Sequence, residues 1–252
     1  MKKTHIRKIT LWYLLITFLI MGFTWGGIYI AQQNGYLTSD SIMFFPLYIF
    51  GGASATIASF IVLTKSGVPV KEWFKNVFGI KQKLSYYFIV VLFLLCYIAI
   101  GFITNSLTMT MSLWYILLLS LTGIVEGGLE EAGWRYVLQA NLEKSMPFSL
   151  ATLITSTIWV LWHLPLFFIE GTAQQNMIFW LFFAFFIAYS FSLAVIRRLT
   201  GSIWLCVLFH AALNAILTVF AIEFRLIETV IMSTVMIIIS LFFLKTLEKH
   251  SH

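Results

Sequence analysis

Charged residues are scarce in this chain: they make up 10% of its 252 residues, whereas 60% are hydrophobic. In a soluble globular domain roughly a quarter of the residues are charged, because the surface must be solvated. The mean hydropathy of +0.94 and the apolar stretches of about twenty residues are typical of transmembrane helices. The composition therefore excludes a soluble domain and predicts a protein that crosses the membrane several times.

Cysteine and the common motifs of hydrolases and ATPases are also scarce or absent. The two cysteines, Cys96 and Cys206, lie in apolar runs, which argues against a disulfide framework. The sequence has no His-Glu-x-x-His, no Gly-x-Ser-x-Gly and no Walker motif, so neither a standard helical zinc protease, nor a serine hydrolase of that type, nor an ATP-driven machine is predicted. The net charge of +6 is interpreted against a lipid bilayer, and no nucleic-acid partner is expected.

Eight apolar segments are expected to form membrane helices. The first follows a basic start that resembles a signal peptide, but its apolar run is too long and lacks a small-residue cleavage site. No stretch between the segments is long enough to fold alone, so we predict a single membrane-integral domain over residues 1–252, an all-α polytopic bundle. The expected segments are residues 10–31, 42–64, 85–104, 112–131, 148–168, 178–196, 202–221 and 227–244.

The connections between these segments distribute their basic residues unequally. With the N-terminus in the cytoplasm, fifteen of the sixteen basic residues fall on the cytoplasmic side, and only Arg225 lies outside. This skew follows the positive-inside rule and favours an even number of spans, with both termini cytoplasmic. The expected location, a bacterial cell membrane, is a separate expectation that the skew does not establish. The fifteen are Lys2, Lys3, Arg7, Lys8, Lys65, Lys71, Lys75, Lys81, Lys83, Arg135, Lys144, Arg197, Arg198, Lys245 and Lys249.

The connection over residues 69–84 is expected to be more than a loop. Its apolar side chains recur at the spacing of one helix face, whereas Lys71, Glu72 and Lys75 fall on the other face. We therefore predict an amphipathic helix that lies on the inner leaflet and anchors the chain. Its apolar face consists of Val70, Trp73, Phe74, Val77 and Phe78.

Ionisable side chains inside membrane helices are costly, which makes each of them a candidate functional residue. The stretch GIVEGGLEEAGWRYVLQ, residues 123–139, holds three of the ten acidic residues. Glu131 and Arg135 are four apart and are expected to form an ion pair. Glu130 points about 100° away from Glu131 and shares a helix face with Glu126. Two carboxylates on one face repel each other in a low dielectric, so one of them must be protonated, or a cation, a histidine or a polarised water must lie between them. The alternative is a helix end that emerges into the cytoplasm, where charges are solvated.

Polar residues recur in two later segments. His163 precedes Pro165 in the fifth segment, and the seventh contains His210 and Asn214 on one helix face. Singly, each fits a hydrogen-bonded packing residue. Together with Glu130 they supply a carboxylate, two imidazoles and a carboxamide on three helices, which can activate a metal or a water and stabilise an oxyanion. We therefore expect one shared site.

The expected boundaries leave one geometric difficulty. If residues 112–131 end at the cytoplasmic surface, His163 lies about 24 Å along the next helix, at about 1.5 Å per residue. A site shared with Glu130 then requires a strong tilt, a helix broken near Pro165, or different segment boundaries.

These residues fall into three motifs that resemble those of the CPBP family of intramembrane proteases, the CAAX protease and bacteriocin-processing family, also called Abi. The family pattern is Glu-Glu-x-x-x-Arg, Phe-x-x-x-His and His-x-x-x-Asn, and it occurs here in the same order over roughly residues 112–220. The sequence departs from the family at Trp159, where Phe is usual, and at Tyr136, where many members have Gly. The motifs read EEAGWR at residues 130–135, WVLWH at 159–163 and HAALN at 210–214.

The resemblance implies an intramembrane (metallo)endopeptidase in which Glu130 and His163 activate a water. His210 and Asn214 would hold a cation or stabilise the tetrahedral oxyanion, and the other motif residues would orient the site. Glu130, His163 and His210 are also the ligands that could hold Zn²⁺ with an open water position, although the same chemistry can be written without a metal. The implied catalytic set is Glu130, Glu131, Arg135, His163, His210 and Asn214.

The expected partner is a membrane-associated peptide or protein substrate within the lipid bilayer. The C-terminal segment of a lipidated protein, a bacteriocin or signalling-peptide precursor, and a remnant of another membrane protein all fit, with access from the cytoplasmic side or laterally. No prenyl-binding groove is identified by the sequence. Two other functions stay open: a proton- or cation-coupled transporter, for which no inverted repeat is visible, and a non-catalytic bacteriocin-immunity or scaffold protein.

Overall fold

The computed structural model describes residues 3–248, which form an α-helical bundle with one two-stranded sheet. The all-α class expected from the composition is confirmed, and Lys2 and Lys249 of the basic set lie outside the described residues. Short 3-10 helices at Gly128–Glu130, Leu164–Phe168 and Ala173–Asn176 and a π-helix at Trp134–Gln139 accompany the α-helices. The α-helices are α1 (Lys3–Gln33), α2 (Phe44–Gly52), α3 (Ser54–Lys65), α4 (Val70–Val77), α5 (Leu84–Ile103), α6 (Tyr115–Glu126), α7 (Glu131–Gly133), α8 (Ala140–Leu142), α9 (Phe148–Trp162), α10 (Phe179–Thr200), α11 (Ile203–Val219) and α12 (Leu226–Glu248).

Five of the described helices are long and apolar enough to cross a membrane, and a sixth span arises if α2 and α3, bent by 45° where they meet, count as one. The helices α6 and α11 are apolar but shorter. Each of the eight expected segments therefore contains helix, but the expected count of eight full spans is corrected to five or six. The two short helices pack against each other, and much of the remaining surface of α6 is exposed.

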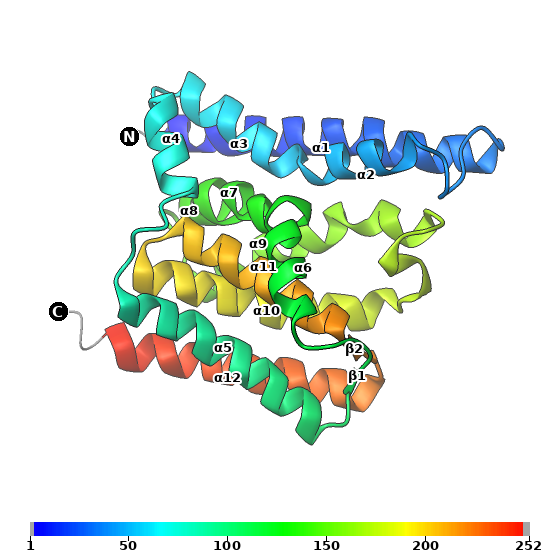
Figure 1. Ribbon diagram of the computed structural model, residues 1–252. Helices are drawn as coiled ribbons and strands as arrows, with labels where there is room; N and C mark the ends of the chain where they lie inside the picture. The colour runs from blue at the N-terminus through cyan, green and yellow to red at the C-terminus, as the bar shows by residue number, and fades with distance from the viewer. Residues whose placement is uncertain (1–2, 249–252) are drawn as a thin grey trace.

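The helices stack in three layers (Figure 1). In one outer layer α1 packs against α2 and α3, and in the other α5 packs against α12. The inner layer contains α6 to α11, with α10 packed on α9 and on α12, and α11 packed on α6. Both termini lie at one end of the bundle, here called the terminal end. The antiparallel pair β1 (Leu107–Met109) and β2 (Phe220–Ile222) lies at the opposite, distal end.

The core between the α1 layer and the inner layer is aromatic. Trp162 of α9 lies 4.5 Å from Trp25 of α1 and 5.6 Å from Trp134, measured between ring centroids. All three rings are buried. Their packing joins the first helix to the two chain segments that carry the first and second motifs.

The expected segment 112–131 is wrong in its boundaries. The helix α6 ends at Glu126, the backbone breaks at Gly127 (φ −151°, ψ −42°), and helical structure resumes at residue 128 and continues to Leu142. Arg135, which was expected in a cytoplasmic connection, is therefore fully buried in the bundle. Charged residues usually mark the end of a membrane segment, but here partners inside the protein neutralise them.

With the corrected boundaries, Glu130 and His163 no longer lie at very different depths in the bundle. The arm formed by residues 128–142 packs against α9, and the two meet at a turn near Ser145. Glu130 and His163 lie a comparable number of residues from that turn. Two arms that run in opposite directions therefore bring these side chains to a similar depth without a strong tilt.

The amphipathic helix expected over residues 69–84 is present only in its first half, as α4. Trp73 and Val77 are buried, and the Trp73 Nε1–H donates to Ser59 Oγ at 3.1 Å, whereas Phe74 is exposed. The helix ends at Val77 because the chain must turn to enter α5. Part of the apolar face thus packs on the bundle, and the rest of it is exposed.

Candidate active site

A cavity of about 520 Å³ between the inner layer and the layer of α1 and α2 is lined by residues of all three motifs. The first motif contributes Glu130, the second His163, and the third both His210 and Asn214. Glu126, which lies just before the break in the chain, also lines the cavity. The structure thus brings together the residues that were expected to share one site, although they come from three separate parts of the chain.

Glu130 is held by two indole groups. Its Oε2 accepts hydrogen bonds from Trp159 Nε1 at 2.8 Å and from Trp134 Nε1 at 3.3 Å. The residue is 6% exposed and lines the cavity. Because both bonds fall on one oxygen, Oε1 is left to interact with a water or a substrate.

His163 lies at the C-terminal end of α9, where Pro165 follows in the 3-10 turn. Its Nδ1–H donates to the carbonyl oxygen of Trp159 at 2.8 Å. A carbonyl can only accept, so this bond places the hydrogen on Nδ1, and in the neutral ring Nε2 carries the lone pair. Trp159 therefore contacts both Glu130 and His163, through its side chain and its backbone respectively.

Glu131, the neighbour of Glu130, belongs to a different environment. It is completely buried, with Oε2 at 3.1 Å from Arg135 Nε and Oε1 at 2.8 Å from His210 Nδ1. The expected ion pair between Glu131 and Arg135 is present, and the contact to His210 was not foreseen. Since Glu131 and Arg135 are 0% exposed, the alternative of a solvated helix end does not hold.

Arg135 extends this network away from the cavity. Its Nη1–H donates to Gln139 Oε1 at 3.0 Å, and Gln139 Nε2 donates to Thr152 of α9 at 3.0 Å and to Glu143 at 2.9 Å. The guanidinium also lies 5.4 Å from the centre of the Trp159 ring. Arg135 and Gln139 are in the π-helix, a distortion often found at functional sites. Burying a charge is costly unless its partners are in place, so the network fixes the first motif against α9.

Two residues outside the third motif shape its surroundings: Tyr189 bonds to it, and Gly127 faces it. Tyr189 of α10 donates from its hydroxyl to the His210 carbonyl oxygen at 3.0 Å and lies 3.4 Å from Asn214 Oδ1. A Cβ atom at Gly127 would lie 2.9 Å from His210 Nε2 and 3.0 Å from Asn214 Nδ2. The missing side chain at Gly127 therefore leaves open the space in front of these two groups.

With this geometry established, the chain can be compared with known proteins. A family model described as type II CAAX prenyl endopeptidase Rce1-like matches residues 111–216. Residues 111–216 are thus similar to the CAAX protease family. The matched region is less than half of the chain but contains all three motifs, and it lies close to the 112–220 expected from them. No curated protein matches the chain.

This similarity, together with the helices of membrane-spanning length, supports an integral membrane endopeptidase of the CAAX type. Metal binding is a separate matter. Among the described residues, no group of three His, Cys, Asp or Glu side chains could hold a metal ion. As placed in the structure, Glu130, His163 and His210 do not form a zinc centre, although Nε2 of each histidine is left open because Nδ1 makes the contact to a protein oxygen.

Three residues of the candidate site were not identified from the sequence. Trp134 and Trp159 hold Glu130, and Tyr189 joins His210 to Asn214. The signal for the two indoles was available, because Trp134 is four residues after Glu130 and Trp159 is four residues before His163. Tyr189 lies outside the motifs, and no local pattern distinguishes it from the other aromatic residues of α10.

The other departure from the family, Tyr136, does not line the cavity. Its hydroxyl accepts a hydrogen bond from Asn76 of α4 at 2.7 Å. The tyrosine therefore ties the amphipathic helix to the arm that carries the first motif, and it leaves the site residues untouched.

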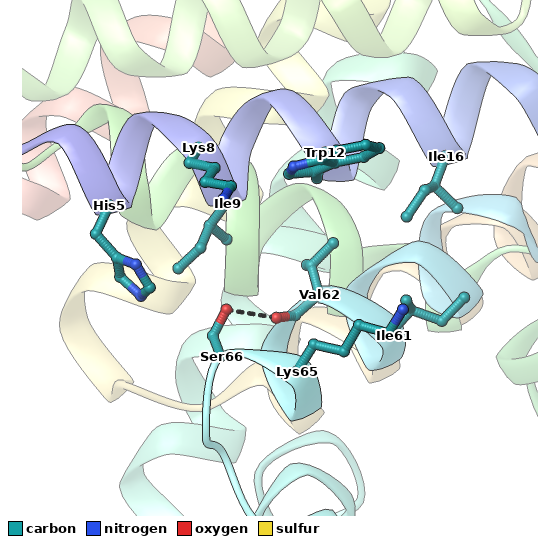
Figure 2. A pocket seen from close by; sticks show the side chains of 9 residues that line it. All are labelled: His5, Lys8, Ile9, Trp12, Ile16, Ile61, Val62, Lys65 and Ser66. Carbon is teal, nitrogen blue, oxygen red and sulfur yellow. Dashed lines mark hydrogen bonds between the residues drawn. The ribbon is translucent and has the colours of Figure 1, made fainter.

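A second cavity, of about 410 Å³, lies between α1 and α3 at the terminal end (Figure 2). Its lining combines Lys8 and Lys65 with apolar side chains such as Trp12 and Ile61. It contains no residue of the three motifs. The two cavities thus differ in position and in charge.

Proposed function

We propose that the protein is an intramembrane endopeptidase that hydrolyses a peptide bond of a membrane-associated peptide with a water activated by Glu130 and His163. One observation carries the proposal: on the wall of one cavity, the protein leaves two hydrogen-bond acceptor atoms available for a water. Protein hydrogen bonds occupy Glu130 Oε2 and His163 Nδ1, which leaves Glu130 Oε1 and His163 Nε2 for a water. The family match supports the reaction class.

In the proposed reaction the water oxygen attacks the peptide carbon while Glu130 takes one proton from the water. His163 Nε2 accepts a hydrogen bond from the remaining hydrogen and orients the water. When the tetrahedral intermediate collapses, the C–N bond breaks and Glu130 returns its proton to the leaving amine. General acid–base catalysis of this kind contributes about 10²–10⁴-fold to a rate.

The negative oxygen of the intermediate would lie in the space that Gly127 leaves open. Asn214 Nδ2 is a hydrogen-bond donor facing this space. His210 Nε2 also faces this space, and the contact of His210 Nδ1 with Glu131 fixes the direction of the ring. Losing one such donor costs about 10²–10³-fold in rate in other acyl-transfer enzymes.

Glu131 and Arg135 act in this scheme as positioning residues. They do not line the cavity, but Glu131 holds the His210 ring and Arg135 holds Glu131. Their proposed task is to keep His210 Nε2 directed at the space beside Gly127, because a small displacement of a catalytic group lowers the rate steeply.

The replacement Glu130→Gln tests the proposal. Purified protein would be placed in liposomes with a library of fluorophore–quencher peptides that have apolar residues around each bond and an acyl anchor. We expect cleavage to fall by about 10²–10⁴-fold while the helical content and the unfolding temperature persist, because Gln keeps the shape and can still accept from the two indoles.

The matched control is Glu170→Gln, which changes an exposed carboxylate outside the cavity and should leave cleavage unchanged. Retained cleavage by the Glu130→Gln protein would overturn the catalytic assignment. If neither parent nor variant cleaves any peptide but both bind one equally, the non-catalytic scaffold function replaces it.

A further inference from the structure

The cavity that holds the candidate site is directed toward the distal end of the bundle. Its lining includes Ala173, Gln174 and Met177 from the connection between α9 and α10. It continues past the site along Thr218, at the end of α11, to Ile222 of β2. Figure 1 shows the β1–β2 pair at the end of the bundle opposite both termini.

On the terminal side the cavity is closed. Glu131, Arg135 and Gln139 are all 0% exposed and occupy the bundle between the cavity and the turn that follows α8. Among the described residues, the connections 66–69, 78–83 and 143–147 contribute nothing to the lining. A peptide therefore reaches Glu130 and His163 from the distal end and not through the terminal end.

The two ends of the bundle also differ in charge. The distal connections carry one basic residue, Arg225, which pairs with Glu223 at 3.7 Å and with Glu228 at 3.4 Å. Asp40 and Glu170 add further acidic charge there. The terminal end has many basic residues in its connections and helix ends, among them Lys65, Lys71, Lys75, Lys81, Lys83, Lys144, Arg197, Arg198 and Lys245.

By the positive-inside rule, the basic terminal end faces the cytoplasm. We therefore propose that the site takes its peptide from the extracytoplasmic side of the membrane. This inference rests on the proposed function, since it names the side from which the scissile bond reaches Glu130 and His163. It departs from the cytoplasmic access expected from the sequence, because the sequence did not show toward which end the cavity is directed.

The substrate class follows from the side and from the lining. The distal half of the cavity is rich in apolar and aromatic side chains, so the segment around the scissile bond carries apolar residues. A peptide presented there is exported or is the outer end of a membrane-anchored chain, and it is not the cytoplasmic tail of a lipidated protein. The lining side chains of this type are Trp25, Tyr48, Met177, Phe182, Phe185, Phe186, Leu217, Ile222 and Phe224.

The second cavity agrees with this orientation. Figure 2 shows Lys8 of α1 and Lys65 of α3 on its lining together with Trp12 and Ile61. A basic groove with apolar walls at a membrane surface suits the anionic headgroups of the cytoplasmic leaflet. The cavity that holds the candidate site, here called the distal cavity, has no lysine or arginine in its lining.

Cysteine labelling tests the side of access directly. Thr218→Cys places a thiol on the exposed part of the distal lining, and Lys71→Cys places one on α4 at the terminal end. Intact bacterial cells expressing each variant would be treated with a membrane-impermeant sulfonated maleimide, before or after permeabilisation. The parent chain is the blank, because Cys206 is buried and Cys96 is half-buried in α5.

We expect Thr218→Cys to react in intact cells and Lys71→Cys only after permeabilisation. Ala173→Cys, on the same lining, provides a second distal position in case the first variant folds poorly. Reaction of the distal thiols only after permeabilisation, or no reaction of either from outside, would overturn the proposal.

A cleavage assay connects access with catalysis. A reporter with one membrane helix would carry the cleavable apolar segment either outside or in the cytoplasm. We expect only the outside segment to be cut, and treatment of Thr218→Cys cells with the impermeant reagent to stop the cut while parent cells remain active. Cleavage of the cytoplasmic segment alone would overturn the proposed side.

The two proposals can fail separately. Labelling is also measured in the Glu130→Gln background, where the expected pattern does not depend on hydrolysis. If the labelling pattern holds but no reporter is cut, the endopeptidase proposal fails and the side of access stands. If the labelling pattern is reversed while cleavage depends on Glu130, the side fails and the endopeptidase proposal stands.

Discussion

Glu130 and Glu131 are adjacent in the chain but belong to two different regions of the molecule. Glu130 lies on the wall of the distal cavity, where two indoles hold one oxygen and leave the other available. Glu131 lies in a closed network, where Arg135 and His210 contact both of its oxygens. A carboxylate with a free oxygen on a cavity can exchange a proton with a water, whereas one with both oxygens engaged can only orient its partners.

In the proposed reaction, the reacting groups differ from the positioning groups in the number of atoms that the protein already satisfies. The same contrast applies to the histidines, since both use Nδ1 for a protein contact and keep Nε2 for the site. Variants of the network should therefore affect folding first, and variants of the cavity wall should affect turnover first. Four changes should therefore differ in what they affect and in how strongly.

Arg135→Met should give the largest effect, on stability. The substitution leaves Glu131 buried without its cation, and removing one member of a buried ion pair typically costs about 3–5 kcal/mol of unfolding free energy. Unfolding by denaturant in detergent micelles measures the loss. Arg197→Met is the control, because its pair with Glu143 is partly exposed and such pairs contribute at most about 1 kcal/mol. Equal losses for the two variants would contradict the closed network.

Gly127→Ala should lower turnover by about 100-fold, as small displacements of catalytic groups do. The added methyl group would lie 2.9 Å from His210 Nε2 and 3.0 Å from Asn214 Nδ2. Gly52→Ala is the matched control in the same cavity, where a Cβ finds its nearest neighbour at 3.9 Å. The liposome assay compares the two variants. Similar activities would contradict the proposed position of the oxyanion beside Gly127.

Trp159→Phe should reduce kcat by about tenfold with little change in KM, because Glu130 loses its shorter hydrogen bond while Trp134 retains the longer one. Trp162→Phe serves as the control. It removes an equally buried indole of α9 that donates to Ser54 and not to Glu130. A parallel fall in both variants would mean that packing, and not the bond to Glu130, matters.

Chelation should have the smallest effect. Because the described residues offer no group of three metal-binding side chains, we expect cleavage to continue after treatment with EDTA or 1,10-phenanthroline. Inactivation that Zn²⁺ reverses would instead show that the site rearranges around a metal when substrate binds. The parent chain and Glu130→Gln, treated alike, separate loss of a metal from loss of fold.

Much of the site could be predicted from the sequence because motif spacing is a local property. Helical spacing alone paired Glu131 with Arg135 and put His210 and Asn214 on one face. The boundaries of the fourth segment could not be predicted, because Arg135 looks like the end of a membrane helix until its buried partners are known. The contact between Glu131 and His210 could not be predicted either, since it joins residues that are 79 positions apart.

Hydropathy and three short motifs were enough to predict a helical membrane protein that resembles the CAAX protease family. The packing of the helices was needed to show which carboxylate faces a cavity, which one is enclosed, and toward which end of the bundle the cavity is directed. Composition and periodicity fix only what each helix can bury. Which groups satisfy one another, and which atoms are left over for chemistry, depends on how the helices pack.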